Sequence, residues 1–101
     1  MKKMYQVLMA AAITSTAFAQ SQRLVMVEEF TQASCGPCAA QNPAFNAVLA
    51  ANTTKATSLK YQTSWPGVDP MNAQNPTEVQ TSVNFYGGIG VPDAIIDGNV
   101  F

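Results

Sequence analysis

The stretch V-M-V-E-E-F-T-Q-A-S-C-G-P-C, residues 25–38, places an apolar strand directly before two cysteines. Apolar and β-branched residues dominate from Arg23 to Phe30, which favours a largely buried β-strand. A helical pattern follows from Cys35 to about Ala51, with alanine-rich filler between its larger residues. Its predicted apolar stripe consists of Phe45, Val48 and Leu49. The cysteines are therefore expected at the N-terminus of a helix that follows a buried strand.

The motif Cys35-Gly36-Pro37-Cys38 carries the chemistry of this chain. Two cysteines three residues apart at a helix start lie close enough to form a disulfide. Unpaired N–H groups of the first helical turn stabilise a thiolate over a thiol, so Cys35 is the predicted nucleophile. Cys38, one turn deeper and less exposed, is predicted to resolve a mixed disulfide with a substrate.

Three other interpretations of the two cysteines remain open at this point. They could form a plain structural disulfide, although its small loop would constrain the unfolded chain little. They could bind a metal, but two thiolates are too few ligands unless two chains share the site. They could also be two inert buried thiols. The chain has no histidine, which excludes histidine-dependent catalysis, and we expect no metal and no cofactor.

The rest of the chain predicts further elements, with loops between them. In order they are a strand at 57–63, a loop at 64–74, a helix to about 86, a strand at 93–97 and the start of an antiparallel strand at 99–101. The second helix shows its own start, because Asn75 is a good N-cap and Pro76 fits the first helical position. Glu78 falls at the capping-box position.

The N-terminal residues 1–19 are predicted to be a signal peptide. Lys2 and Lys3 precede an apolar run at 7–13, and Ala17-Phe18-Ala19 has the small residues of a cleavage site. The run is too short to span a bilayer. An amphipathic helix of the mature protein is the alternative, but the segment has no polar face. We expect an exported domain at 20–101, periplasmic or extracellular or at the cell surface, with no membrane span after cleavage.

Composition fits one small domain and excludes several classes of protein. The 101 residues are 48% hydrophobic and 11% charged, with a formal net charge of −1, which rules out collagen-like and highly charged disordered chains. No basic run follows Lys3. Nucleic-acid binding is not expected, because little positive charge is available to neutralise phosphates.

In four linked places the sequence resembles the thioredoxin family. These are the strand Val25–Phe30, the C-G-P-C motif, Pro43 five residues after Cys38, and Y-G-G-I-G-V-P at 86–92. The resemblance implies an α/β thioredoxin-like fold with a mixed sheet flanked by helices. It also implies a thiol-disulfide oxidoreductase with a Cys35–Cys38 disulfide, acting on protein thiols and disulfides together with an unidentified redox partner.

The resemblance assigns substrate binding to two segments. Val91-Pro92 would be a cis peptide bond packed against the cysteines, with backbone beside it that pairs with an extended substrate segment. Gly36 and Pro37 would contribute the surface between the cysteines. An ordinary trans turn proline at position 92 is the alternative.

Glu29 falls where the family carries a buried carboxylate beneath the cysteines. Since a buried carboxyl favours its neutral form, Glu29 is predicted to accept the proton of Cys38 during resolution. The alternative places Glu28 inward and Glu29 in solvent, and side-chain alternation along the strand favours Glu29. Lys60, in the next strand, could pair with Glu29.

The sequence also departs from the family pattern. Ser34 stands where an aromatic residue usually precedes the first cysteine, and Trp65 either supplies an aromatic wall instead or packs at the domain edge. The chain ends at Phe101, inside the expected hairpin. The C-terminal strand and helix are therefore predicted to be truncated, with one sheet face partly bare.

Two functional hypotheses follow. The first is an exported thiol-disulfide oxidoreductase that uses Cys35, Cys38 and Glu29. The second is a non-catalytic thioredoxin-fold binding or structural module at the front of a larger secreted surface protein, to which the sequence has a looser similarity. The intact cysteines, Pro43 and Val91-Pro92 favour the enzyme, since an inert module needs no helix-terminal thiolate.

Overall fold

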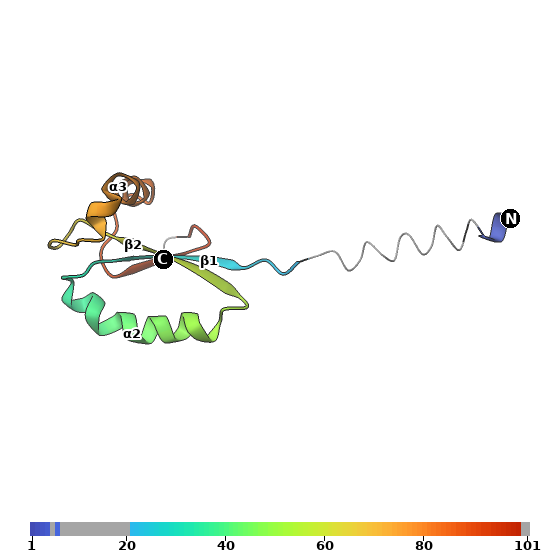
Figure 1. Ribbon diagram of the computed structural model, residues 1–101, viewed down its shortest axis with the longest axis horizontal. Helices are drawn as coiled ribbons and strands as arrows, with labels where there is room; N and C mark the ends of the chain where they lie inside the picture. Colours follow the sequence, from blue (N-terminus) through green and yellow to red (C-terminus); the bar gives the residue numbers. More distant parts are fainter. Residues whose placement is uncertain (5, 7–20, 100–101) are drawn as a thin grey trace.

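Three strands form a mixed sheet in the order β2-β1-β3 (Figure 1). The central strand β1 (Val25–Thr31) pairs in parallel with β2 (Ala56–Gln62) and antiparallel with β3 (Asp93–Ile96). This computed structural model describes residues 1–4, 6 and 21–99. The predicted α/β class and mixed sheet are confirmed. Most of the predicted signal peptide lies outside the described residues.

Two helices lie on opposite faces of the sheet (Figure 1). The parallel pair β1 and β2 needs a crossover connection, and α2 (Gly36–Ala51) provides it. On the other face, α3 (Pro76–Phe85) precedes β3. The predicted loop at 64–74 contains a short 3-10 helix, η1 (Asn72–Gln74).

The main core lies between the sheet and α3. Its fully or nearly buried members are Phe30, Val83, Ile89 and Ile95. Phe30 stacks on Tyr61, with their ring centroids 4.7 Å apart. Because successive strand residues point to opposite faces, Val27 and Glu29 face α2 when Phe30 faces α3. The single sheet therefore separates an apolar core from a face that carries a buried carboxylate.

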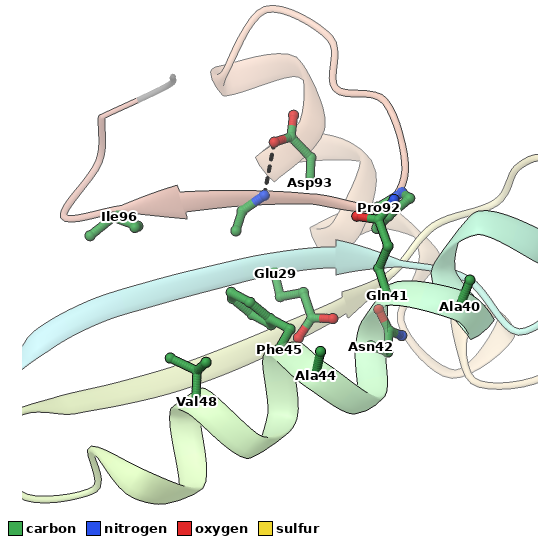
Figure 2. Close-up of a pocket in the computed structure, with 11 residues that line it drawn as sticks. Glu29, Ala40, Gln41, Asn42, Ala44, Phe45, Val48, Pro92, Asp93 and Ile96 are labelled. Carbon is green, nitrogen blue, oxygen red and sulfur yellow. Dashed lines mark hydrogen bonds between the residues drawn. The ribbon is translucent and has the colours of Figure 1, made fainter.

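The apolar stripe predicted for α2 is only partly buried. Phe45 and Leu49 are half-buried, but Val48 is 59% exposed. Val48 lies on the side of α2 that faces β3, where a groove of about 830 Å³ separates the two elements (Figure 2). Phe45 and Val48 line the same groove, as the predicted stripe requires, but Val48 stays exposed because no other element among the described residues covers it.

The predicted capping box of α3 does not form. Asn75 is the N-cap and Pro76 the first residue of α3, as predicted, but the Asn75 side chain makes no capping hydrogen bond. The reason is that Asn75 also ends η1, where its backbone N–H donates to the Asn72 carbonyl at 3.0 Å. Its backbone, with φ −152° and ψ 57°, serves two helices at once.

The tight turn after β3 is present at Asp97-Gly98, where both residues have positive φ. Asp97 also fastens this turn to β1, because its carboxylate accepts from the Met26 N–H at 3.0 Å and from Arg23 at 2.8 Å. These contacts lower the pKa of Asp97. Beyond the turn, Ile96 forms an isolated antiparallel bridge with Asn99. The rest of the predicted fourth strand lies outside the described residues.

Glu28 faces α3 and accepts hydrogen bonds from two tyrosine hydroxyls. Tyr61 donates to one carboxylate oxygen at 2.9 Å, and Tyr86 donates to the other. Tyr86 follows α3 directly and leads into the glycine-rich segment at 87–90. The contact therefore joins the end of α3 to the central strand.

We expect Tyr86→Phe to remove the part of the tyrosine titration that lies at the highest pH. The hydrogen bond to Glu28, followed by burial, raises the pKa of Tyr86 to about 12. The pKa of Tyr86 is higher in the folded chain than in the unfolded chain, where it is about 10. The contact with Glu28 therefore stabilises the fold fully below about pH 10, and this stabilisation is lost as the pH rises through about 12. An ultraviolet absorbance titration of tyrosinate measures this. An unchanged upper part of the curve in the variant would contradict it.

Candidate active site

Cys35 and Cys38 form a disulfide at the start of α2, with their Cα atoms 5.2 Å apart. Cys35 is the N-cap residue, in an extended backbone conformation, and Pro37 lies in the first helical turn. The backbone N–H of Cys38 donates to the Cys35 sulfur at 3.1 Å. The first-turn amide predicted to stabilise a Cys35 thiolate therefore already points at that sulfur.

The expected difference in exposure between the two cysteines is small. Cys35 is 3% exposed and Cys38 is 1% exposed. Gly36 and Pro37 between them are exposed. With both cysteines buried, the dipeptide forms the outer surface of the motif.

The glycine-rich segment before β3 brings Val91 next to Cys35. The Val91 carbonyl oxygen lies 3.7 Å from the Cys35 sulfur, although these residues are 56 positions apart. The Val91-Pro92 peptide bond is cis, as the resemblance implies. Gly87 and Gly88 both have positive φ, a conformation that side chains with a Cβ disfavour. β3 begins directly after Pro92, so its pairing with β1 fixes this segment beside the cysteines.

Glu29 is 2% exposed and lies on the α2 side of the sheet (Figure 2). The burial predicted from side-chain alternation is confirmed. Lys60 is directly opposite Glu29 in the parallel register of β1 and β2, and its ammonium group forms an ion pair with Oε2 of Glu29. Lys60 also donates to Asn46 Oδ1 at 2.7 Å. The buried carboxylate thus has a cationic partner that reaches the protein surface.

Asn42 links Glu29 to the second cysteine, and sequence reasoning missed it. Its amide oxygen accepts from Thr31 Oγ1 at 2.9 Å in the orientation that satisfies the whole amide. Its nitrogen then donates to Glu29 Oε1 at 3.1 Å and to the Cys38 carbonyl at 3.2 Å. The sequence spacing could have identified Asn42, because a residue four positions after Cys38 lies on the same face of the helix.

Asp69 is a second residue that sequence reasoning missed. It is 4% exposed and accepts three backbone N–H groups. The donors are Ala33 at 2.9 Å, Met71 at 2.8 Å and Asn72 at 3.4 Å. Asp69 therefore fastens the loop after β2 to the turn that enters Cys35.

Trp65, in the same loop, contributes to the hydrophobic core. It is half-buried and packs against the core cluster around Phe30, and its bond to Pro66 is cis. The indole ring therefore serves the core beneath the loop.

Within residues 1–4, 6 and 21–99, no three Cys, Asp or Glu side chains come close enough together to hold a metal ion. None of the helices in that part of the chain has the length and apolar character to cross a membrane.

Comparison with models of protein families, with curated proteins and with solved structures finds no match to this chain.

Proposed function

We propose that this chain is an exported thiol-disulfide oxidoreductase with a thioredoxin-like fold, which exchanges disulfides with protein substrates. One observation carries the proposal. Cys35 is the N-cap of α2, and its sulfur both bonds to Cys38 and accepts the Cys38 N–H. That amide contributes little to a purely structural disulfide, whose sulfur is a weak acceptor, whereas it would stabilise a thiolate at the same place much more strongly.

The first step is attack by Cys35. In the reduced protein, its thiolate attacks one sulfur of a substrate disulfide and forms a mixed disulfide. The other substrate sulfur leaves as a thiolate. In the disulfide form the Cys38 N–H lies 3.1 Å from the Cys35 sulfur, and the same amide would stabilise the negative charge of the Cys35 thiolate.

The second step is resolution by Cys38. Its thiol gives up a proton and attacks the Cys35 sulfur, which restores the Cys35–Cys38 disulfide and releases the second substrate sulfur. Two electrons pass from the protein dithiol to the substrate. Glu29 accepts the proton, and Asn42 supports this role because it holds the carboxylate and the Cys38 backbone together.

Substrate is proposed to lie across the surface of the motif. Gly36 and Pro37 supply the exposed part between the cysteines. Backbone at Val91 and Pro92 lies beside Cys35 and would pair with an extended segment of the substrate. The sulfur under attack would then lie between these two segments.

The proposed location is the periplasm or the extracellular side, following signal-peptide cleavage after Ala19. The steps above run in either direction. A protein partner sets the direction, because about 30 mV between two potentials changes the exchange by about 1.4 kcal/mol.

The test is the equilibrium of the Cys35–Cys38 pair in dithiothreitol and glutathione redox buffers, together with the rate of Cys35 alkylation. We expect a potential in the oxidoreductase range, between about −270 and −120 mV, and rapid alkylation of Cys35 below pH 7. A pair below about −300 mV with a slow Cys35 would instead fit a structural disulfide in a binding module.

A further inference from the structure

The loop after β2 rests on the turn that leads into Cys35 at two points. The first is the part-buried hydrogen bond from the Ala33 N–H to Asp69, at 2.9 Å. The second is close packing of Gly67 on Ser34, because a Cβ at position 67 would come within 2.3 Å of Ser34 Oγ. Gly67 thus contacts Ser34 and Asp69 contacts Ala33, and these are the two residues directly before Cys35.

Val68 lies between these two contacts and is 87% exposed. Gly67 and Asp69, on either side of Val68, both contact the turn before Cys35. The backbone of Val68 is therefore fixed at the surface next to that turn. An apolar side chain displayed in this way loses little conformational freedom when it contacts a partner. The position is suited to a contact surface.

The turn itself offers no large apolar side chain. The two residues before Cys35 are alanine and serine. The Ser34 hydroxyl and N–H both lie 2.6 Å from Gln32 Oε1, so its polar atoms are turned inward. Any apolar contact on this side of Cys35 has to come from the adjoining loop.

We propose that Val68 is a specificity-determining contact, which receives an apolar side chain next to the cysteine of a polypeptide substrate. The inference rests on the proposed function, since the contact forms while Cys35 attacks the substrate disulfide. The Val91 carbonyl lies beside the Cys35 sulfur. Backbone pairing at Val91 and an apolar contact at Val68 would therefore hold the substrate from two different segments.

Two short peptides test this, each with one cysteine joined by a disulfide to thionitrobenzoate. One peptide has leucine beside the cysteine and the other has serine. Attack of reduced Cys35 on the peptide sulfur forms the protein–peptide disulfide and releases coloured thionitrobenzoate. Resolution by Cys38 then releases the peptide thiol. The small symmetric disulfide of the same dye is a third substrate, without any peptide.

The variant Val68→Ser is compared with Val48→Ser, a matched exposed valine about 20 Å from Cys35 along α2. We expect Val68→Ser to lower kcat/KM for the leucine peptide about fivefold, as loss of a partly buried valine contact implies. The serine peptide and the small disulfide should react at the wild-type rate. Val48→Ser should match wild type on all three.

Two results would overturn the inference. One is an unchanged preference for the leucine peptide in Val68→Ser, which would show that this side chain makes no contact. The other is an equal loss on all three substrates, which would place the effect on Cys35 itself. A wild-type protein that fails to react even with the small disulfide would overturn the proposed function as well.

Discussion

Replacing Cys35 with serine is expected to reduce disulfide exchange below detection, whereas Cys38→Ser is expected to stop the reaction at the mixed disulfide. The serine hydroxyl in the first variant is not ionised at neutral pH and attacks no disulfide. The second variant keeps Cys35 with the same helix N-terminus behind it. It lacks only the thiol that displaces the substrate.

Intact-mass measurement under non-reducing conditions distinguishes the two variants. Cys38→Ser should carry one covalently bound peptide, released by dithiothreitol, after incubation with a peptide disulfide. Cys35→Ser should carry little, because the described contacts give the Cys38 sulfur no N–H donor like the one that the Cys35 sulfur has. The two variants serve as controls for one another. Equal adducts on both would show that the structure does not assign attack to Cys35.

The sequence predicted those parts of the site that depend on local pattern. A buried strand followed by a helix start locates both cysteines, because the capping position of Cys35 depends only on adjacent residues. Alternation along β1 separated Glu29 from Glu28, which have opposite surroundings in the structure. The partner Lys60 followed from the expected second strand, and its register opposite Glu29 confirms that pairing.

Other parts depend on contacts between distant segments, which local pattern does not report. Asp69 contacts Ala33 across 36 positions, and its loop looked like ordinary turn sequence. Val48 followed the helical stripe but faces an open groove, since periodicity shows which face is apolar and not what covers it. The capping box failed for a related reason, because Asn75 is shared with η1.

Glu29→Gln is expected to slow resolution by Cys38 about 10²-fold, the lower end of what a positioned general base contributes. The amide cannot accept the proton that Cys38 gives up. Attack by Cys35 should keep its wild-type rate, because the contact that stabilises its thiolate comes from the Cys38 backbone. The mixed disulfide should therefore accumulate. Rapid-quench experiments with a peptide disulfide at several pH values separate the two steps.

Glu28→Gln is the matched control, because it changes the neighbouring residue on the same strand. Glu28 faces α3 and contacts Tyr61 and Tyr86, so both steps should keep their wild-type rates. Glu29→Gln also leaves the Lys60 ammonium without its carboxylate. The double variant Glu29→Gln/Lys60→Gln removes that charge and should be as slow in resolution as the single variant.

The pH dependence decides what Glu29 does. If Glu29 accepts the proton, the pH profile of resolution should differ from that of the wild type in both Glu29 variants and match it in Glu28→Gln. If its role were only to hold Asn42, a glutamine side chain could still accept the hydrogen bond from Asn42. Resolution in Glu29→Gln would then keep the wild-type rate and pH profile, and proton transfer to Glu29 would be excluded.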